Sequence, residues 1–291
     1  MKDKHSPGNP NPLLAQTRTL MRQFGLRARK GLGQHFLIDP AALESSISAA
    51  ELSPEDVVIE VGPGLGVLTE KLAESVKRVV AIEIDPQITS ALNKRFSKLS
   101  NITVLNTDVL RFSPSDYFKS ELDSRAFKYK LVANLPYYVA APTIRHFLEA
   151  ELKPHRMVVM VQKEVAESIA AVPGKMSILG VSVQFYGKPS IVDYVPAGSF
   201  YPAPKVNSAI VRIDVYDRPV VEVETEGFFR VVRAGFSSPR KQLRNALAQG
   251  LSVEPTIASG LLDEAGILSQ RRAETLNLEE WARLYEVVGL V

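Results

Sequence analysis

Three glycines stand at alternate positions after a short apolar run, and this spacing is typical of a nucleotide-binding turn. Residues 57–61 include β-branched side chains of the kind found in a strand that is buried on both faces. Gly62, Gly64 and Gly66 then allow a tight turn in which the backbone can approach a ligand closely. Helical spacing of apolar residues begins near Leu68. A strand that leads through a glycine turn to a helix N-terminus is suited to bind a nucleotide.

The exact order of these glycines narrows the choice of ligand. A dinucleotide fingerprint needs Gly-x-Gly-x-x-Gly, but position 67 is Val. The chain contains no Gly-Lys-Ser or Gly-Lys-Thr, which excludes a P-loop. For the glycines taken alone, a tight turn without a ligand remains the alternative.

Two acidic residues follow at the ends of further predicted strands. The apolar run 79–83 ends at Glu83, 21 positions after Gly62. An acid at about this distance accepts hydrogen bonds from ribose hydroxyls. Asp108 follows a third strand at 102–105, where it could meet the edge of an adenine. Together these residues suit an adenosine that carries no phosphate, as in S-adenosylmethionine.

A second set of chemically useful residues follows the predicted strand 129–133. Asn134 offers an amide and a carbonyl, and Tyr137 offers a flat ring. Pro136 stiffens the turn between them and biases Leu135 away from helical geometry. Asn-x-Pro-Tyr at a strand end suits a planar base whose exocyclic amine must be oriented. A β-turn capped by the Asn is the alternative for this tetrapeptide alone.

The composition excludes several classes of protein. With 291 residues and 45% hydrophobic content, the chain can form one large domain and a small one. It has no cysteine and only four scattered histidines, so we expect no disulfide and no metal centre. No apolar run approaches the roughly 20 residues of a membrane helix, and the N-terminus lacks a signal-peptide pattern. We expect a soluble, cytoplasmic protein without membrane partners.

The basic residues concentrate in two stretches of the chain. Residues 4–38 contain six Lys or Arg and no acid, and residues 227–253 contain five and no acid. Outside these stretches, 24 of the 35 basic residues remain against 32 acidic ones. Local basic patches on an otherwise acidic protein indicate a polyanionic partner. For either stretch alone, an ordinary solvated surface is the alternative.

The order of predicted elements indicates an α/β fold followed by a helical domain. Strands and helices alternate to about residue 215, which predicts a doubly wound, Rossmann-like sheet with ligands at the carboxyl ends of its strands. The pattern at 179–186 fits either a strand or a helix. Three parts are expected: a flexible basic tail at 1–27 with a short helix near 17–24, a nucleotide-binding domain at 28–216 and a helical domain at 217–291.

Four helices are predicted in the last part, and their basic residues are expected to share helix faces. The helices are expected at 228–234, 241–247, 256–265 and 278–288. Arg230 and Arg233 have the spacing of one helix face, and so do Arg240 and Arg244. Asn277 is the expected N-cap of the last helix.

Five motifs make the chain resemble one family of enzymes, the small-subunit ribosomal RNA adenine dimethyltransferases. The resemblance runs from about residue 28 to residue 285. The motifs that carry it are residues 31–37 (GLGQHFL), 60–66 (EVGPGLG), 134–137 (NLPY), 200–209 (FYPAPKVNSA) and 236–245 (FSSPRKQLRN). The glycine motif is shared by many methyltransferases, whereas the first and last motifs are specific.

The resemblance implies a class I methyltransferase that uses S-adenosylmethionine and releases S-adenosylhomocysteine, without a metal. It implies dimethylation at N6 of two adjacent adenines in the 3′-terminal hairpin loop of 16S (small-subunit) rRNA, as a step of ribosome biogenesis. The implied partner is this rRNA within an immature 30S particle, and the enzyme is expected to be a monomer.

The family's donor contacts map onto residues of this chain. They are His35, Leu37, Gly62, Gly64, Glu83, Asp108 and Asn134. Position 35 departs from the family pattern, in which Asn is usual. Both side chains can hydrogen-bond, but a contact through His depends on its tautomer and protonation.

A mechanism follows for the reaction that the resemblance implies. The lone pair of the adenine amine is delocalised into the ring, so the site must favour a tetrahedral nitrogen. The Asn134 side-chain oxygen and the Leu135 carbonyl would accept the two amine hydrogens, and no general base is required. Tyr137 and Phe200 would hold the base between their rings. Phe200 as an ordinary core residue is the alternative.

The basic stretches would hold RNA phosphates outside the pocket. The candidate residues are Arg29, Lys30, Arg230, Arg233, Arg240, Lys241 and Arg244. Two other functions stay open at this point. One is a large-subunit rRNA adenine methyltransferase of the macrolide-resistance type, which typically has Ile at the position of Leu135. The other is a non-catalytic ribosome-assembly factor with the same fold, against which intact Glu83, Asp108 and Asn134 argue.

Overall fold

The computed structural model describes residues 11–121 and 127–289, which form two compact units. The first unit runs to Lys163 and includes Ile191–Arg212. The second unit contains Glu164–Ser190 and the chain from Ile213 onward. The segment 164–190 therefore belongs with the C-terminal helices by its contacts. The domain division at residue 216 stays a prediction.

A seven-stranded sheet has the strand order β4-β3-β2-β5-β6-β9-β7. The strands are β2 (Val57–Val61), β3 (Arg78–Glu83), β4 (Ile102–Asn106), β5 (Tyr129–Asn134), β6 (Arg156–Gln162), β7 (Gly187–Val195) and β9 (Ser208–Val215). The five strands from β4 to β6 are parallel. The order reverses between β2 and β5, which confirms the predicted doubly wound α/β sheet. Ligands bind outside the carboxyl ends of strands at such a reversal.

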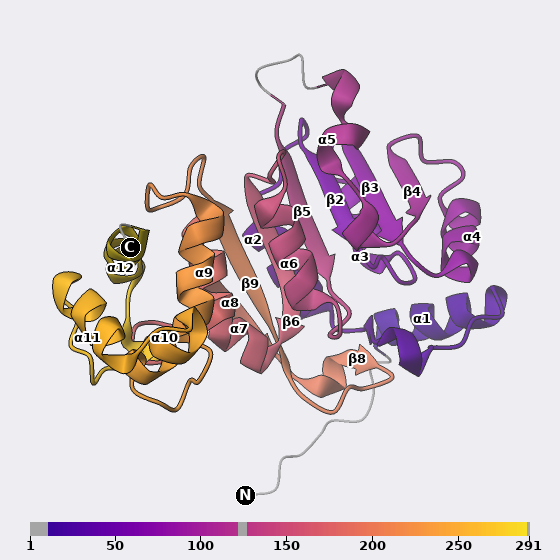
Figure 1. Cartoon of the computed structure of the whole chain (residues 1–291). Helices are drawn as coiled ribbons and strands as arrows, with labels where there is room; N and C mark the ends of the chain where they lie inside the picture. The colour runs from indigo at the N-terminus through magenta and orange to yellow at the C-terminus, as the bar shows by residue number, and fades with distance from the viewer. Residues whose placement is uncertain (1–10, 122–126, 290–291) are drawn as a thin grey trace, which may run out of the picture. The chain divides into compact units, whose positions relative to one another are not determined.

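Helices cover both faces of this sheet in the first unit. The helices of this unit are α1 (Pro12–Gln23), α2 (Pro40–Ala50), α3 (Val67–Ala73), α4 (Pro86–Arg95), α5 (Pro114–Tyr117) and α6 (Ala140–Glu149), of which α2, α3 and α4 pack directly on the strands. In Figure 1, α6 lies in front of the sheet and α2 behind it. Asp39 and Asp85 cap α2 and α4, since their carboxylates accept from Ala41 N at 2.9 Å and Gln87 N at 3.0 Å. These two starts agree with the Asp-Pro pairs in the sequence.

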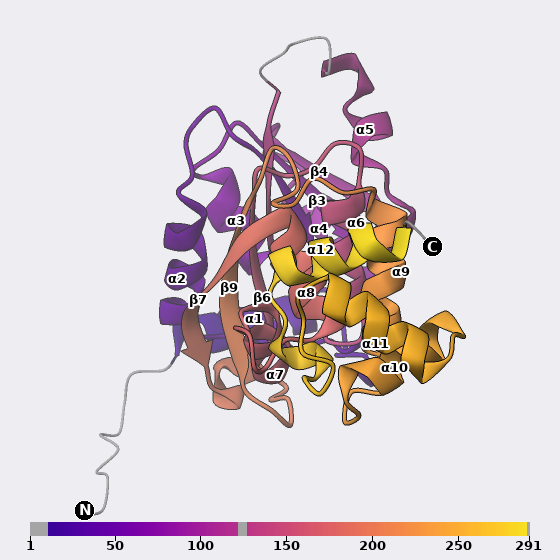
Figure 2. The ribbon, with the colours of Figure 1, turned by 60° about the vertical axis from the view of Figure 1, so that its left-hand side comes forward.

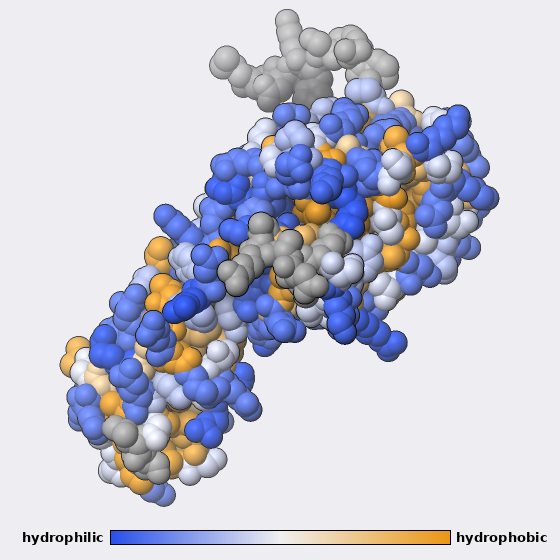
Figure 3. Space-filling model, turned by 90° about the horizontal axis from the view of Figure 1, so that it is seen from above, coloured by the Kyte–Doolittle hydropathy of each residue, from blue (hydrophilic) through white to orange (hydrophobic). Residues whose placement is uncertain are grey.

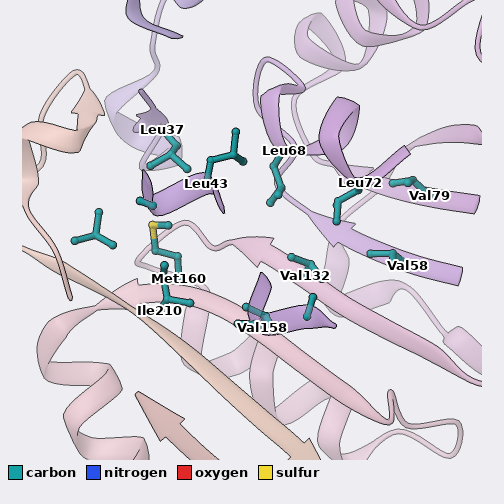
Figure 4. Packing of buried hydrophobic residues seen from close by; sticks show 14 of the residues in the cluster. Leu37, Leu43, Val58, Leu68, Leu72, Val79, Val132, Val158, Met160 and Ile210 are labelled. Carbon is teal, nitrogen blue, oxygen red and sulfur yellow. The ribbon is translucent and has the colours of Figure 1, made fainter. Parts of the chain in front are cut away.

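The main core lies between α2, α3 and the sheet (Figure 4). Leu43 of α2 and Leu72 of α3 pack in one cluster with Val58 of β2 and Val132 of β5. Along β2 all five residues are buried. A parallel strand covered on both faces has no side toward solvent, which explains the apolar residues at four of its five positions, with Glu60 as the exception. This core fixes the glycine turn that follows β2.

The N-terminal segment contains a longer helix than we predicted. Helix α1 begins at Pro12, within the stretch expected to be flexible. Its apolar residues stabilise it by packing against the rest of the unit. Leu20 and Met21 pack against a cluster that contains Phe36 and Phe96. The Asn11 side-chain amide donates to the Ile38 carbonyl at 2.7 Å. Residues 1–10 of the predicted tail lie outside the described residues.

A short two-stranded sheet continues this segment. Strand β1 (Phe36–Leu37) pairs antiparallel with β8 (Phe200–Tyr201), with Leu37 opposite Phe200. Ile38 N donates to the Ser199 carbonyl at 2.8 Å, and the Ser199 hydroxyl donates to the Asp39 carboxylate at 2.6 Å. The motifs at 31–37 and 200–209 therefore lie side by side.

The second unit is built from helices around an aromatic core. They are α8 (Ile178–Tyr186), α9 (Thr225–Gly235), α10 (Leu243–Leu251), α11 (Pro255–Glu264) and α12 (Leu278–Gly289), while α7 (Lys163–Ile169) spans the boundary between the units. Helix α11 packs against both α10 and α12, and Figure 2 shows it between their labels. Residues 179–186, which the sequence left open between strand and helix, lie in helix α8. Ser177 is the N-cap of this helix, and its hydroxyl accepts from Gly180 N at 3.0 Å. Asn277 caps α12 as predicted, accepting from Glu280 N at 2.8 Å.

One predicted helix begins later than expected. Helix α10 starts at Leu243, and Arg240 and Lys241 precede it in a turn where Lys241 N donates to the Ser238 carbonyl at 2.9 Å. Pro239 follows Ser238 and favours this turn over a helix. The prediction that Arg240 and Arg244 share a helix face is therefore wrong.

Candidate active site

A cavity of about 310 Å³ opens at the carboxyl ends of β2, β3 and β5 in the first unit. Its walls come from the glycine turn, the ends of β3 and β4, the Asn134–Tyr137 turn and the loop before β1. All seven residues predicted to hold a donor line it. They are His35, Leu37, Gly62, Gly64, Glu83, Asp108 and Asn134, joined by Leu135 and Tyr137 from the predicted base site.

The glycine turn has backbone angles and neighbours that exclude larger side chains. Gly64 and Gly66 have φ of +56° and +81°, where glycine is favoured. A Cβ at Gly66 would lie 2.6 Å from the Phe96 ring, and a Cβ at Gly64 would lie 3.1 Å from the Phe36 ring. The backbone of the turn therefore lines the cavity on one side and packs against Phe36 and Phe96 on the other.

The two predicted constellations meet at this turn. A Cβ added to Gly62 would lie 3.3 Å from Cδ of Pro136 and 3.7 Å from the carbonyl oxygen of Asn134. The glycine motif and the Asn-Leu-Pro-Tyr motif are 72 positions apart in the sequence, but the parallel pairing of β2 with β5 brings their ends together. One ligand can therefore contact both.

Glu83 and Asp108 stand at neighbouring strand ends, as predicted. Glu83 is buried, and its carboxylate accepts from Asp85 N at 2.8 Å. Burial raises the pKa of Glu83 to about 7, although backbone N–H groups that include Asp85 N oppose this shift. Asp108 is half-buried and accepts from Leu110 N at 3.0 Å. Each carboxylate retains acceptor capacity toward the cavity.

A third acid, Glu60, lies in the cavity wall beneath the turn. It is 1% exposed, and its Oε2 has no hydrogen-bond partner among the described residues. Burial raises its pKa to about 8, the Thr69 hydroxyl lowers it in part, and the charge of Glu83 raises it further. A buried carboxyl oxygen without a partner is costly unless a ligand or water satisfies it. A cationic ligand would both pair with Glu60 and favour its ionised form.

Asn134 is held in one orientation by the loop before β1. Its Nδ2 donates to the His35 carbonyl at 3.3 Å, so its Oδ1 is the acceptor that remains for a ligand. Leu135 is buried, and its N–H donates to the Met160 carbonyl at 3.1 Å, which fixes the peptide after Asn134. Two carbonyl oxygens, Asn134 Oδ1 and Leu135 O, thus belong to a rigid turn at the cavity.

Tyr137 and His35 form a stacked pair beside these carbonyls. Their ring centroids are 5.7 Å apart with an interplanar angle of 26°. The Tyr137 hydroxyl is hydrogen-bonded to Ser208 Oγ at 2.8 Å, and His35 Nδ1 donates to the Pro202 carbonyl at 2.7 Å. Burial raises the pKa of Tyr137, while the Ser208 hydrogen bond lowers it in part. His35 therefore supports the Tyr137 ring through its side chain and Asn134 through its backbone.

Phe200 is placed differently from Tyr137. It is 3% exposed and belongs to the main hydrophobic cluster with Leu37 and Ile210. It does not appear among the described residues that line the cavity. The structure therefore gives Phe200 the surroundings of a core residue, and a stacking role for it stays a prediction.

The loop before β1 is tied to the end of β3 by polar contacts that sequence reasoning missed. Gln34 accepts from Arg29 N at 2.8 Å and donates to the Asp85 carboxylate at 3.2 Å. An Arg29 guanidinium nitrogen lies 3.4 Å from the same carboxylate. Arg29, expected to hold RNA, thus also pairs within the protein. The motif at 31–37 contained Gln34, but only the fold shows its partner.

The basic candidates of the second unit are largely at the surface. Arg230 and Arg233 of α9 are exposed, as are Arg240 and Lys241 in the turn before α10, while Arg244 is half-buried. The side chain of Lys30 lies outside the described part of the chain.

On the face drawn in Figure 3, hydrophobic residues reach the surface in small groups among hydrophilic ones.

The described residues contain neither a membrane-spanning helix nor a cluster of metal ligands. No helix there is long and apolar enough to span a membrane. Within the same residues, no group of three or more His, Cys, Asp or Glu is arranged to hold a metal ion.

Comparison with known proteins places these features in one family. The family model described as ribosomal RNA adenine dimethylase matches residues 25–288. A ribosomal RNA small subunit methyltransferase A of Dehalococcoides mccartyi is 50% identical over 94% of this chain and 92% of its own length. One of Bacillus cereus is 39% identical over 100% of this chain and 99% of its own.

Solved structures agree on the fold. A dimethyladenosine transferase from Plasmodium falciparum has a TM-score of 0.72 and 25% identity, covering 86% of this chain and 96% of the other. The 23S rRNA methyltransferase ErmE has a TM-score of 0.67 and 27% identity, covering 87% and 99%. The sheet, the cavity at its carboxyl edge and the matched motifs have the same explanation: this chain belongs to the ribosomal RNA adenine dimethylase family.

Proposed function

We propose that this chain is an rRNA adenine dimethyltransferase that methylates N6 of two adjacent adenines in the 3′-terminal hairpin loop of small-subunit rRNA. The observation that carries the proposal is the meeting of Gly62 with Asn134 in one cavity, where a Cβ on the glycine would lie 3.7 Å from the Asn134 carbonyl. A nucleoside site and an amine-orienting turn are thereby within reach of each other.

S-adenosylmethionine is the donor that the cavity residues fit. Glu83 would accept the ribose hydroxyls, and Asp108 would accept from the adenine edge. The unpartnered carboxyl oxygen of Glu60 suits a positively charged group. When bound, the donor supplies a methyl group attached to a positively charged sulfur. After the methyl group is transferred, the donor is released as S-adenosylhomocysteine. This chemistry requires no metal.

The Asn134 turn would act on the adenine amine. Asn134 Oδ1 and the Leu135 carbonyl would accept hydrogen bonds from its two N–H groups and favour a tetrahedral nitrogen whose lone pair is no longer delocalised into the ring. As the N–CH3 bond forms, the S–CH3 bond would break with its electron pair kept by sulfur, and the methylated nitrogen would then lose one proton to solvent. The contacts to His35 and Met160 hold both acceptors in place before the base arrives, so little reorganisation is needed. Placement of N6 opposite the donor would supply much of the remaining rate gain. Tyr137 would stack on the base after it leaves its own stack in the loop.

The RNA partner would be held outside the cavity by basic residues. Arg230 and Arg233 present exposed guanidiniums that suit phosphates. We propose that the substrate is the rRNA of an immature 30S particle and that a cytoplasmic monomer acts on it. Two features support small-subunit rather than large-subunit rRNA: Leu135 in the key turn, and relatives at up to 50% identity that are named small-subunit methyltransferases.

One experiment tests the assignment. Immature small subunits from a strain that lacks this enzyme would be incubated with tritiated S-adenosylmethionine and the purified chain, and the product would be sequenced. We expect two methyl groups on each of two adjacent adenines in the 3′-terminal hairpin. Label on large-subunit rRNA instead would support the macrolide-resistance type of enzyme. Donor binding without transfer to either RNA would support a non-catalytic assembly factor.

A further inference from the structure

Tyr138 is an aromatic residue at the cavity that the proposed mechanism does not use. It lines the cavity, yet it is 57% exposed. Its neighbour Tyr137 is half-buried and hydrogen-bonded to Ser208, whereas no described residue is hydrogen-bonded to the Tyr138 hydroxyl. A large ring left in water beside a cavity gains most when a ligand covers it.

The ring of Tyr138 rests on the loop before β1. A Cβ added to Gly33 would lie 3.4 Å from Cδ1 and 3.8 Å from Cε1 of this ring. These are ordinary van der Waals distances, so the ring lies directly beside the loop at Gly33, whose φ is +58°. Tyr138 therefore has a defined position even though it is exposed.

The same ring lines one cavity with the acids of the nucleoside site. Burial and the negative charges of Asp108 and Glu83 all raise the pKa of Tyr138. Its hydroxyl therefore stays uncharged in the cavity that these two carboxylates also line. Ile84 and Leu110, which follow the acids, also line the cavity and are 45% and 41% exposed. Three exposed apolar or aromatic side chains thus surround the acidic end of the cavity.

We propose that Tyr138 is a donor-binding residue, which covers the adenosine half of S-adenosylmethionine at the cavity mouth while Gly33 supports its ring. This inference rests on the proposed function, because it takes the nucleoside at Glu83 and Asp108 to be the methyl donor. Tyr138 would contact the nucleoside end, whereas Asn134 and Tyr137 would contact the base that is methylated.

Calorimetric titration of the full chain with S-adenosylhomocysteine, without RNA, tests the proposal. Tyr138→Ala should weaken binding by about 10-fold, the order expected when one aromatic stacking contact is lost. Tyr138→Trp and Tyr138→Phe, which keep a ring, should bind within about 3-fold of wild type. Tyr194→Ala is the matched control, because Tyr194 is 51% exposed but does not line the cavity. Its affinity should be unchanged.

The possible failures are distinguishable. If wild type binds S-adenosylhomocysteine and Tyr138→Ala binds it equally well, the proposal is overturned while the function stands. If that variant instead raises only the KM for RNA, Tyr138 contacts an RNA base, and the donor role is again overturned. If wild type binds neither S-adenosylmethionine nor S-adenosylhomocysteine, the proposed function itself fails. Thermal unfolding of each variant would confirm that it is folded.

Discussion

The cavity has a donor side, formed by Gly62, Gly64, Glu83 and Asp108, and a base side, formed by His35, Asn134, Leu135 and Tyr137. The residues of the donor side lie at or just after the carboxyl ends of three neighbouring strands, β2, β3 and β4, so the sheet largely positions them. The base side depends on contacts between distant segments. Asn134 is bonded to His35, 99 positions away, and His35 is bonded to Pro202, 167 positions away.

This difference shows how the two sides can fail separately. The donor side shares the strands with the core, so changes there would disturb both binding and folding. The base side consists of side-chain and backbone groups that are oriented by hydrogen bonds and contribute less to the hydrophobic core. Substitutions on the base side should therefore reduce catalysis more than they reduce donor binding or stability, and the predictions below test this separation.

The largest effect is expected at Asn134. Asn134→Ala removes Oδ1, and with it one preorganised acceptor for the amine, so kcat should fall by about 100-fold or more. Donor affinity should weaken by a much smaller factor and remain measurable by calorimetry. Asn93→Ala on the exposed face of α4 is the control and should leave both quantities unchanged. Full turnover by the Asn134 variant would show that the residue has no role in the reaction. It would also contradict the proposal that the base side affects catalysis more than donor binding.

Tyr137 should have the next largest effect. Tyr137→Ala should raise the KM for RNA or lower kcat by about 10-fold or more, which corresponds to the loss of one stacked base. Tyr137→Phe keeps the ring but loses the hydrogen bond to Ser208, so it separates stacking from anchoring. Steady-state kinetics with the rRNA substrate would measure both. Wild-type kinetics for the Ala variant would exclude Tyr137 from the base side.

The sequence allows much of the donor side to be predicted, because its determinants are local. An apolar run, three glycines and an acid at the next strand end define the strand, the turn and the position of Glu83 without reference to the rest of the chain. The carboxyl ends of parallel strands then meet at one edge, and this brought Gly62 to Asn134 as expected.

The base side and the N-terminal segment could be predicted only in part. Stacking of His35 on Tyr137 and burial of Phe200 follow from the pairing of β1 with β8, which no local pattern indicates. Glu60 was visible within the glycine motif, but its unpartnered oxygen is a property of the packed structure. Helix α1 was predicted too short because its apolar residues are stabilised by tertiary contacts rather than by helix propensity.

The pH dependence of donor binding tests the donor side alone. Burial raises the pKa of Glu83 to about 7 and that of Glu60 to about 8, above the ordinary value of 4.5. Between pH 4.5 and these raised pKa values, the unfolded chain binds fewer protons than the folded protein without donor. The free energy of unfolding should therefore fall as pH rises through this range. A cationic donor favours the ionised carboxyls. Its affinity should therefore increase several-fold across the same range.

Calorimetry in buffers of different ionisation enthalpy would detect the proton release that accompanies donor binding. Glu83→Gln and Glu60→Gln should each reduce the slope of affinity against pH. The Tyr137→Ala variant is the control for the base side and should keep the wild-type slope. A donor affinity that is flat with pH in the wild-type protein would contradict the assignment of these two carboxyls to the donor.

The smallest effect is expected outside the cavity, at the exposed arginines of α9. If Arg230 and Arg233 each neutralise one phosphate, the double change to Gln should reduce the slope of log affinity against log salt by about 1.5. RNA affinity at moderate salt should weaken several-fold, while donor affinity stays the same because neither residue lines the cavity. Arg145→Gln is the control, since Arg145 pairs with Glu149 at 2.8 Å on its own helix. An unchanged salt slope in the double variant would mean that other basic residues hold the RNA phosphates and that α9 takes no part in recognition.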